Sequence, residues 1–122
     1  QEKSKFIFMR ISEAFTLQQQ QAEIIKKHFD ACNYPKIICG DLNNSAFSYV
    51  YRTVKGDMKD AFEQAGTGFG KSYNFKYYPA RIDYVFVENN IEVKEFTSLD
   101  SFVQSDHFPQ LTRLNLVQKT EE

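Results

Sequence analysis

The sequence predicts a layered α/β domain with one mixed or antiparallel sheet and flanking helices, because helical patterns come first and strand patterns last. Apolar side chains recur at steps of three, four or seven up to about Ala31, the spacing that gathers them on one face of a helix. Three β-prone runs separated by polar turns follow between residues 82 and 117. Helices followed by several strands favour a layered arrangement in which part of the sheet is antiparallel.

Length and composition indicate a single compact domain, residues 1–122. A chain of 122 residues can bury one core and is short for two. Its 42% hydrophobic and 25% charged residues exclude a disordered or fibrous chain. A net charge of -1 excludes a general basic surface for nucleic acid or anionic membranes.

Targeting signals are not apparent in the sequence. No apolar run reaches the ~20 residues of a membrane-spanning helix, and no signal peptide opens the chain. We therefore expect a soluble segment. Because the chain begins with Gln1 rather than Met, we also expect it to be part of a longer parent protein. The location of the parent, including a membrane anchor upstream, stays open.

The first predicted elements are a helix, a strand and a second helix. The long amphipathic helix ends before Pro35, which forces the preceding residue out of the helical conformation. Lys36–Cys39 then forms a short strand that ends at Gly40. A new apolar periodicity begins after Ser45, whose hydroxyl can cap the next helix. The polar residues after the strand therefore lie at its carboxyl end, where open α/β sheets tend to place ligands.

The second half is predicted to hold one more helix and three strands. Residues 57–65 favour a short helix, and residues 66–70, with glycine at every second position, favour a flexible linker. We do not expect a phosphate-binding loop there, because no strand leads into it. The three strands are predicted at 82–87, 91–96 and 111–117.

Three short polar segments lie where predicted strands begin or end: GDLN at 40–43, RIDY at 81–84 and SDH at 105–107. Each segment alone is weak evidence for a catalytic site, because Asp and Asn also favour turns. Together they supply carboxylates for a divalent cation and for activating water, with donors for phosphoryl oxygens. The combination predicts phosphate hydrolysis.

The ordered series GDLN, RIDYVFV and SDHFP resembles the second half of the endonuclease/exonuclease/phosphatase superfamily, the DNase I-like metal-dependent phosphoesterases. This resemblance extends from the long helix to the last strand. It implies a DNase I-like α/β sandwich and cleavage of phosphodiesters or phosphomonoesters by activated water. The implied partner is a phosphorylated substrate: a nucleic acid, a phospholipid head group or a small phosphoester. Fold analogy does not choose among them.

Carried over residue by residue, the resemblance implies a role for each polar side chain. Asp41 would position and activate the attacking water, while Asn43 holds that water and a phosphate oxygen. His107 would donate to a non-bridging phosphate oxygen, with Asp83 accepting from its other ring nitrogen. Asp106 would ligate Mg²⁺ or Mn²⁺, which polarises the phosphoryl group.

Part of the family pattern has no counterpart here. Motifs of the family's first half, including a metal-ligating Glu, do not match any segment of this chain. We therefore expect Mg²⁺ to be held weakly or not at all, this chain alone to be inactive, and its parent to be an enzyme. Uncovered apolar surface would favour self-association. The alternative is a non-catalytic binding or scaffolding relative, and the role of Arg81, structural or phosphate contact, stays open.

Other reactive side chains have simpler interpretations. Cys32 and Cys39 lack zinc or disulfide spacing and are predicted to be buried free thiols. His28 lies on the long helix without ligand-spaced neighbours and is predicted to be a surface residue. Lys71 and Lys76 favour a solvated loop over a phosphate contact. Five tyrosines in the middle of the chain are more typical of packing between layers than of base stacking: Tyr49, Tyr51, Tyr73, Tyr77 and Tyr78.

Overall fold

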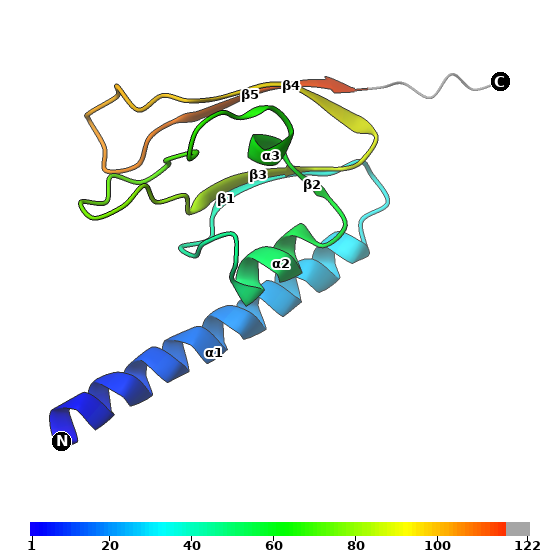
Figure 1. Ribbon diagram of the computed structural model, residues 1–122. Coiled ribbons are helices and arrows are strands. Elements are labelled where there is room, and N and C mark those ends of the chain that lie inside the picture. The colour runs from blue at the N-terminus through cyan, green and yellow to red at the C-terminus, as the bar shows by residue number, and fades with distance from the viewer. Residues whose placement is uncertain (117–122) are drawn as a thin grey trace.

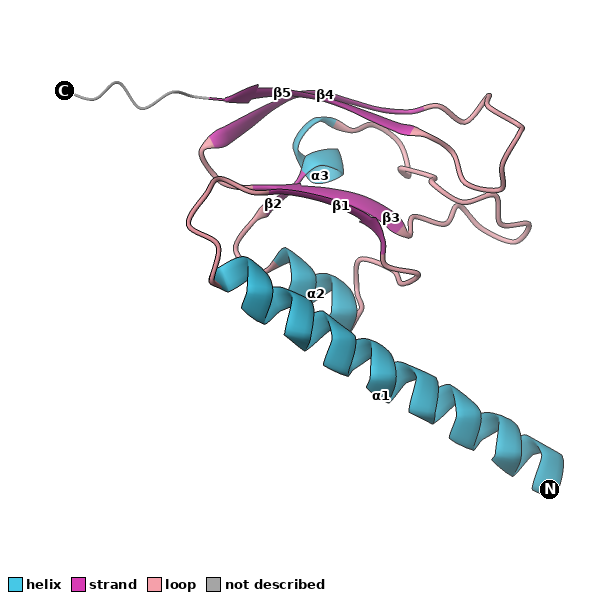
Figure 2. Ribbon diagram, turned by 180° about the vertical axis from the view of Figure 1, so that it is seen from behind, coloured by secondary structure: helices cyan, strands magenta, loops and turns pink. Residues whose placement is uncertain are grey.

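The computed structural model describes residues 1–116, which form helices and two antiparallel sheets in layers (Figure 1). In chain order the elements are α1 (Glu2–Asp30), β1 (Ile37–Asp41), α2 (Tyr49–Lys55), β2 (Lys59–Asp60), α3 (Ala61–Ala65), β3 (Asp83–Val87), β4 (Ile91–Ser98) and β5 (Gln110–Leu116). One sheet has the order β1-β3-β2, and the other is the β4–β5 hairpin. Helices α1 and α2 cover one face of the first sheet, and the hairpin with α3 covers the other (Figures 1 and 2).

Strand β3 lies at the centre of the fold, because its alternate side chains enter two cores. Tyr84 and Phe86 pack among residues of α1 and α2. Val85 and Val87 pack instead against α3 and the hairpin. Phe86 is 1% exposed and Val87 is fully buried. This burial on both faces accounts for the nearly continuous apolar run in the sequence.

The predicted long helix is present, but much of its apolar face is uncovered. Ala22 is buried, and Phe29 packs at the edge of the same core. In Figure 1 the N-terminal half of α1 extends beyond the sheets. Large apolar side chains are exposed there: Phe6, Ile7, Phe8, Met9, Ile11, Phe15 and Leu17. The spacing thus predicted the helix correctly, whereas burial of the apolar face depends on partners that a periodicity does not specify.

The next two helices begin later than predicted. Helix α2 is capped by Ser48, whose Oγ accepts a hydrogen bond from the Tyr51 amide at 3.0 Å, so the assignment of Ser45 as the cap was wrong. The predicted helix at 57–65 is shortened, because β2 pairs with β3 and only Ala61–Ala65 is helical. Tertiary contacts override local propensity at both positions.

The last three predicted strands are present, as β3, β4 and β5, and Val117 lies outside the described residues. They divide between two sheets, so the expected single sheet is in fact a pair. Both Cys32 and Cys39 are free, but they are half-buried and exposed, so the prediction of burial was wrong. His28 is exposed, as predicted. Within residues 1–116, no helix has the combined length and apolar character that crossing a bilayer requires.

Candidate active site

The antiparallel ladder between β1 and β3 brings two of the predicted acidic residues together. Asp41, the last residue of β1, lies directly opposite Asp83, the first residue of β3. Directly opposed residues of an antiparallel pair project their side chains on the same face. The Leu42 amide donates to the Ile82 carbonyl at 2.9 Å, so the pairing continues just past the ladder.

His107 completes a cluster with these two carboxylates. Its Nδ1 lies 2.8 Å from Asp83 Oδ2, a hydrogen-bond distance, and its Nε2 lies 3.9 Å from Asp41 Oδ2. Because Asp83 is an acceptor, its bond orients the ring and favours a proton on Nδ1. A separation of 3.9 Å is too long for a direct hydrogen bond. Nε2 therefore faces Asp41 across a gap that one oxygen atom of water or ligand can bridge.

Electrostatics favour the protonated form of His107. The hydrogen bond to Asp83 is the largest cause of a raised pKa, burial opposes it, and the charges of Asp83, Asp41 and Asp106 add to it. The imidazole is 36% exposed, and the side chains of Asp83 and Asp41 are 21% and 46% exposed. The cluster is thus reachable from solvent, and its charges are partly screened.

The two remaining predicted site residues adjoin the cluster. Asn43 adopts φ +51°, and its amide donates to Asp41 Oδ1 at 2.7 Å. Asn tolerates this left-handed conformation better than most residues, so this turn fixes the Asp41 carboxylate. Asp106 is exposed and precedes His107, and its carbonyl accepts from the Asn74 amide at 2.7 Å. Both residues are held through their backbone in loops that border the cluster.

Residues 72–74 connect the His107 loop to the start of β3, a role that the sequence did not predict. Tyr73 forms bridges with Ala80 and His107, and its ring centroid lies 5.0 Å from that of His107. Ser72, fully buried, accepts hydrogen bonds from the amides at the start of β3. Their signal was the Gly-Lys-Ser run at 70–72, which the interpretation of 66–70 as a linker overlooked. Within residues 1–116 no helix follows this run, so it does not have the form of a phosphate-binding loop.

Arg81 points to a structural partner. Its Nη1 lies 2.7 Å from Oδ2 of Asp60, whose side chain is fully buried. The guanidinium also lies over the rings of Phe62 and Tyr84, 4.6 and 4.8 Å from their centroids. Burial lowers the pKa of Arg81, but the hydrogen bond and charge of Asp60 outweigh it and raise the pKa overall. Of the two alternatives left open by the sequence, this arrangement favours the structural one.

The middle tyrosines divide between packing and exposure. Tyr51 is buried and donates to Asp60 Oδ2 at 2.7 Å. Tyr77 and Tyr78 are 77% and 62% exposed, and their ring centroids lie 5.4 and 4.7 Å from that of Phe75. The packing interpretation therefore holds for Tyr51, whereas the tip of the 74–79 loop presents aromatic rings to solvent.

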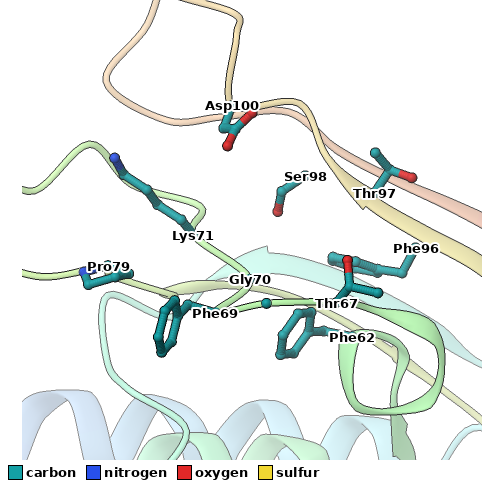
Figure 3. A pocket seen from close by; sticks show the side chains of 11 residues that line it. Phe62, Thr67, Phe69, Gly70, Lys71, Pro79, Phe96, Thr97, Ser98 and Asp100 are labelled. Carbon is teal, nitrogen blue, oxygen red and sulfur yellow. The ribbon is translucent and has the colours of Figure 1, made fainter.

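A cavity of about 360 Å³ is lined by other residues than those of the His107 cluster. Its side chains are drawn in Figure 3. Phe62 and Phe96 form part of its wall, Ser98 faces it from the end of β4, and Asp100 faces it from the following loop. None of the predicted site residues lines this cavity. The catalytic candidates are therefore better identified by their mutual geometry than by the size of a cavity.

The side chains around His107 include the types of ligand atom that a hard divalent cation binds. Asp41, Asp83 and His107 each offer a ligand atom, and these atoms lie within 4.8 Å of one another. Carboxylate oxygens are the ligands that Mg²⁺ prefers. However, the 2.8 Å bond between His107 and Asp83 already engages one ring nitrogen and one oxygen. This bond joins His107 and Asp83 in a pair that can share a proton, and the exposed Asp106 adjoins the cluster in the sequence.

Known proteins resemble this chain in sequence pattern and in fold. Residues 13–107 match the Endonuclease/Exonuclease/phosphatase family. Among curated proteins, none matches the sequence significantly. Solved structures provide several matches. An endonuclease/exonuclease/phosphatase from Bacteroides vulgatus is 30% identical with a TM-score of 0.65, covering 82% of this chain and 44% of its own.

Two matches from Bacteroides thetaiotaomicron have the same fold. A mannosyl-6-phosphatase is 25% identical with a TM-score of 0.59, covering 84% of this chain and 45% of its own. An endonuclease/exonuclease/phosphatase family protein is 23% identical with a TM-score of 0.68, covering 82% of this chain and 44% of its own. The chain thus spans less than half the length of the solved structures that it matches.

Proposed function

Because the chain belongs to the endonuclease/exonuclease/phosphatase family, we propose that the full-length protein hydrolyses phosphoester bonds with activated water and a divalent metal. The observation that carries this proposal is the geometry of His107, with Nδ1 bound to Asp83 and Nε2 facing Asp41 across 3.9 Å. Attack on phosphorus requires a base for the attacking water and a charged donor for a phosphoryl oxygen, and these two groups face each other here.

In this mechanism Asp41 accepts a proton from the attacking water, and the Asn43 amide group holds that water and a phosphate oxygen. The turn at Asn43 supports the role of Asp41, because the Asn43 backbone amide binds Asp41 Oδ1 at 2.7 Å and Asp41 Oδ2 faces His107. His107 donates through Nε2 to a non-bridging phosphoryl oxygen, where negative charge develops. Asp83 stabilises the protonated His107 ring, consistent with the raised pKa of His107.

The metal belongs to the same proposal. Asp106 would hold Mg²⁺ or Mn²⁺, and such an ion, when bound, polarises the phosphoryl group and offsets its charge. One free carboxylate is a small ligand set for Mg²⁺, which keeps its waters and demands regular coordination. We therefore expect residues 1–122 alone to bind the metal weakly and to lack activity.

The substrate is a phosphorylated compound whose class the site leaves open. The mannosyl-6-phosphatase among the similar structures supports including a sugar phosphate monoester among the candidates. Nucleic acids and phospholipid head groups remain alternatives, because the side chains that bind the phosphate do not read the rest of the substrate. A panel of substrates is therefore needed.

The test is hydrolysis by the full-length protein of a nitrophenyl phosphate monoester, a nitrophenyl diester, a sugar 6-phosphate and plasmid DNA, with Mg²⁺ or Mn²⁺. Asp41→Ala and His107→Ala are expected to lower kcat by roughly 10²- to 10⁴-fold, the usual contribution of proton-transfer groups. His28→Ala is the matched control, because that histidine is exposed on α1.

Undiminished activity in the Asp41 and His107 variants would contradict the assigned roles. Absence of cleavage with either metal on every substrate would instead favour the non-catalytic binding or scaffolding relative. Residues 1–122 are assayed alongside, and their self-association is measured by sedimentation. Activity of this chain equal to that of the full-length protein would refute the expectation that further ligands are needed.

A further inference from the structure

Ser72 is buried in a place where serine is unusual. It lies outside every helix and strand of residues 1–116, yet its exposed fraction is 0%. A buried hydroxyl is costly unless it is hydrogen-bonded, and serine is mostly found at the surface. Its burial therefore indicates that its polar atoms are engaged.

The Ser72 side chain binds the backbone at the start of β3. Oγ accepts a hydrogen bond from the Ile82 amide at 2.9 Å and another from the Asp83 amide at 3.0 Å. These two bonds occupy both acceptor positions of a hydroxyl oxygen. Asp83 is also the residue whose carboxylate orients His107, so Oγ fixes the backbone that carries this acceptor.

The Ser72 backbone binds the loop that carries His107. Its carbonyl accepts from the Phe108 amide at 2.8 Å, and its amide donates to the Ala80 carbonyl at 2.9 Å. The next residues extend this contact, because Tyr73 bridges to His107 and the Asn74 amide donates to the Asp106 carbonyl. A single buried residue thus contacts both segments whose side chains form the 2.8 Å bond between His107 and Asp83.

We propose that Ser72 is a positioning residue, which sets the distance between Asp83 and His107 by holding the backbone of both. This proposal rests on the proposed function, in which that pair handles the proton. Ser72 faces the backbone amides and not the cluster, so it acts through Asp83. Partners that orient catalytic ligands from behind typically contribute about 10- to 100-fold to activity.

The test compares Ser72→Ala, which removes the acceptor, with Ser72→Thr, which keeps it, in the full-length protein. Ile91→Val is the control for lost packing, because Ile91 is 1% exposed and belongs to the core between the two sheets. We expect Ser72→Ala to lower kcat by about 10- to 100-fold with little change in KM. Ser72→Thr should restore most of kcat, and Ile91→Val should retain it.

A second measurement separates this inference from the proposed function. Amide hydrogen exchange at Ile82 and Asp83, and the His107 Nδ1 proton resonance, are recorded by NMR at one pH for the same variants. Faster exchange and loss of this resonance in Ser72→Ala alone would support positioning, even where the protein cleaves no tested ester. Unchanged exchange with unchanged kcat, or equal losses in Ser72→Ala and Ile91→Val, would overturn it.

Discussion

The ion pair between Asp60 and Arg81 provides the sharpest stability prediction. Asp60 is fully buried, the Arg81 side chain is 12% exposed, and their nearest atoms are 2.7 Å apart. Asp60 also accepts from the Tyr51 hydroxyl at 2.7 Å, and its Oδ1 accepts from the Phe62 amide to cap α3. Asp60→Asn removes the charge that compensates Arg81 and leaves one acceptor oxygen, so the amide nitrogen takes the place of the other.

The expected cost follows from this burial. Removing one partner of a buried pair leaves the other charge uncompensated, which destabilises by about 3–5 kcal/mol. For an m value of about 2 kcal/mol/M, this lowers the urea midpoint by roughly 2 M. Arg81→Met should cost a similar amount, since it leaves the Asp60 charge buried while preserving apolar contacts of the side chain.

The double variant Asp60→Asn/Arg81→Met distinguishes charge from packing. Because it buries no unpaired charge, it should be more stable than the sum of the single variants indicates, with a coupling energy above about 1 kcal/mol. The measurement is urea denaturation followed by circular dichroism. The exposed pair of Arg113 and Glu95, 3.4 Å apart, is the control and should contribute less than about 1 kcal/mol. Additive single variants, or a cost of Asp60→Asn no larger than that of Glu95→Gln, would refute the reasoning.

Three further predictions concern His107, Gly70 and the metal. Because the pKa of His107 is raised in the folded state, protonated His107 should stabilise the fold fully below about pH 6.5, and this stabilisation should be lost as pH rises through the folded pKa. Asp83→Asn should flatten the pH dependence of the free energy of unfolding, measured by urea titration. The same pH dependence in this variant and the parent protein would contradict the prediction. Gly70→Ala should destabilise the protein more than Gly68→Ala. Both glycines have φ near +65°, but only at Gly70 would an added Cβ lie 2.7 Å from the Phe62 ring. Equal melting temperatures of the two variants would contradict the prediction. EDTA should abolish hydrolysis by the full-length protein and Mg²⁺ or Mn²⁺ restore it, whereas activity that persists in EDTA would exclude the metal.

The parts of the fold that the sequence predicted are those set by local pattern. The apolar run of β3 and the spacing along α1 identified their elements correctly, because alternation and helical periodicity directly reflect which side chains share a face. Helix α2 was different, since two serines could cap it. Tyr84 donates to the Asn44 carbonyl at 2.7 Å, and Asn44 donates to Gln18 at 3.0 Å. These distant contacts fix the preceding loop and leave Ser48 as the cap.

The same distinction applies to the site. Asp41, Asp83 and His107 were proposed from short motifs, and the structure brings their side chains within 4.8 Å. The residues that hold neighbouring segments in place were not foreseen, because the Gly-Lys-Ser run at 70–72 does not reveal the bonding partners of Ser72 and no pattern marks Asp60. Ser72 bonds to the Ile82 amide, 10 residues away, and Asp60 pairs with Arg81, 21 residues away. Only the folded backbone reveals such bonds.

Geometry and environment make separate contributions at this site. The His107 and Asp83 side chains already lie at hydrogen-bond distance, so orientation does not require a further element. Asp41 is 46% exposed at the end of β1, an edge strand among the described residues, and His107 is 36% exposed. Charges so accessible to water interact weakly, whereas stabilisation of a phosphoryl transition state is strongest in a site that excludes water. The expected inactivity of residues 1–122 alone would therefore reflect missing ligands and missing enclosure, and not a misplaced catalytic pair.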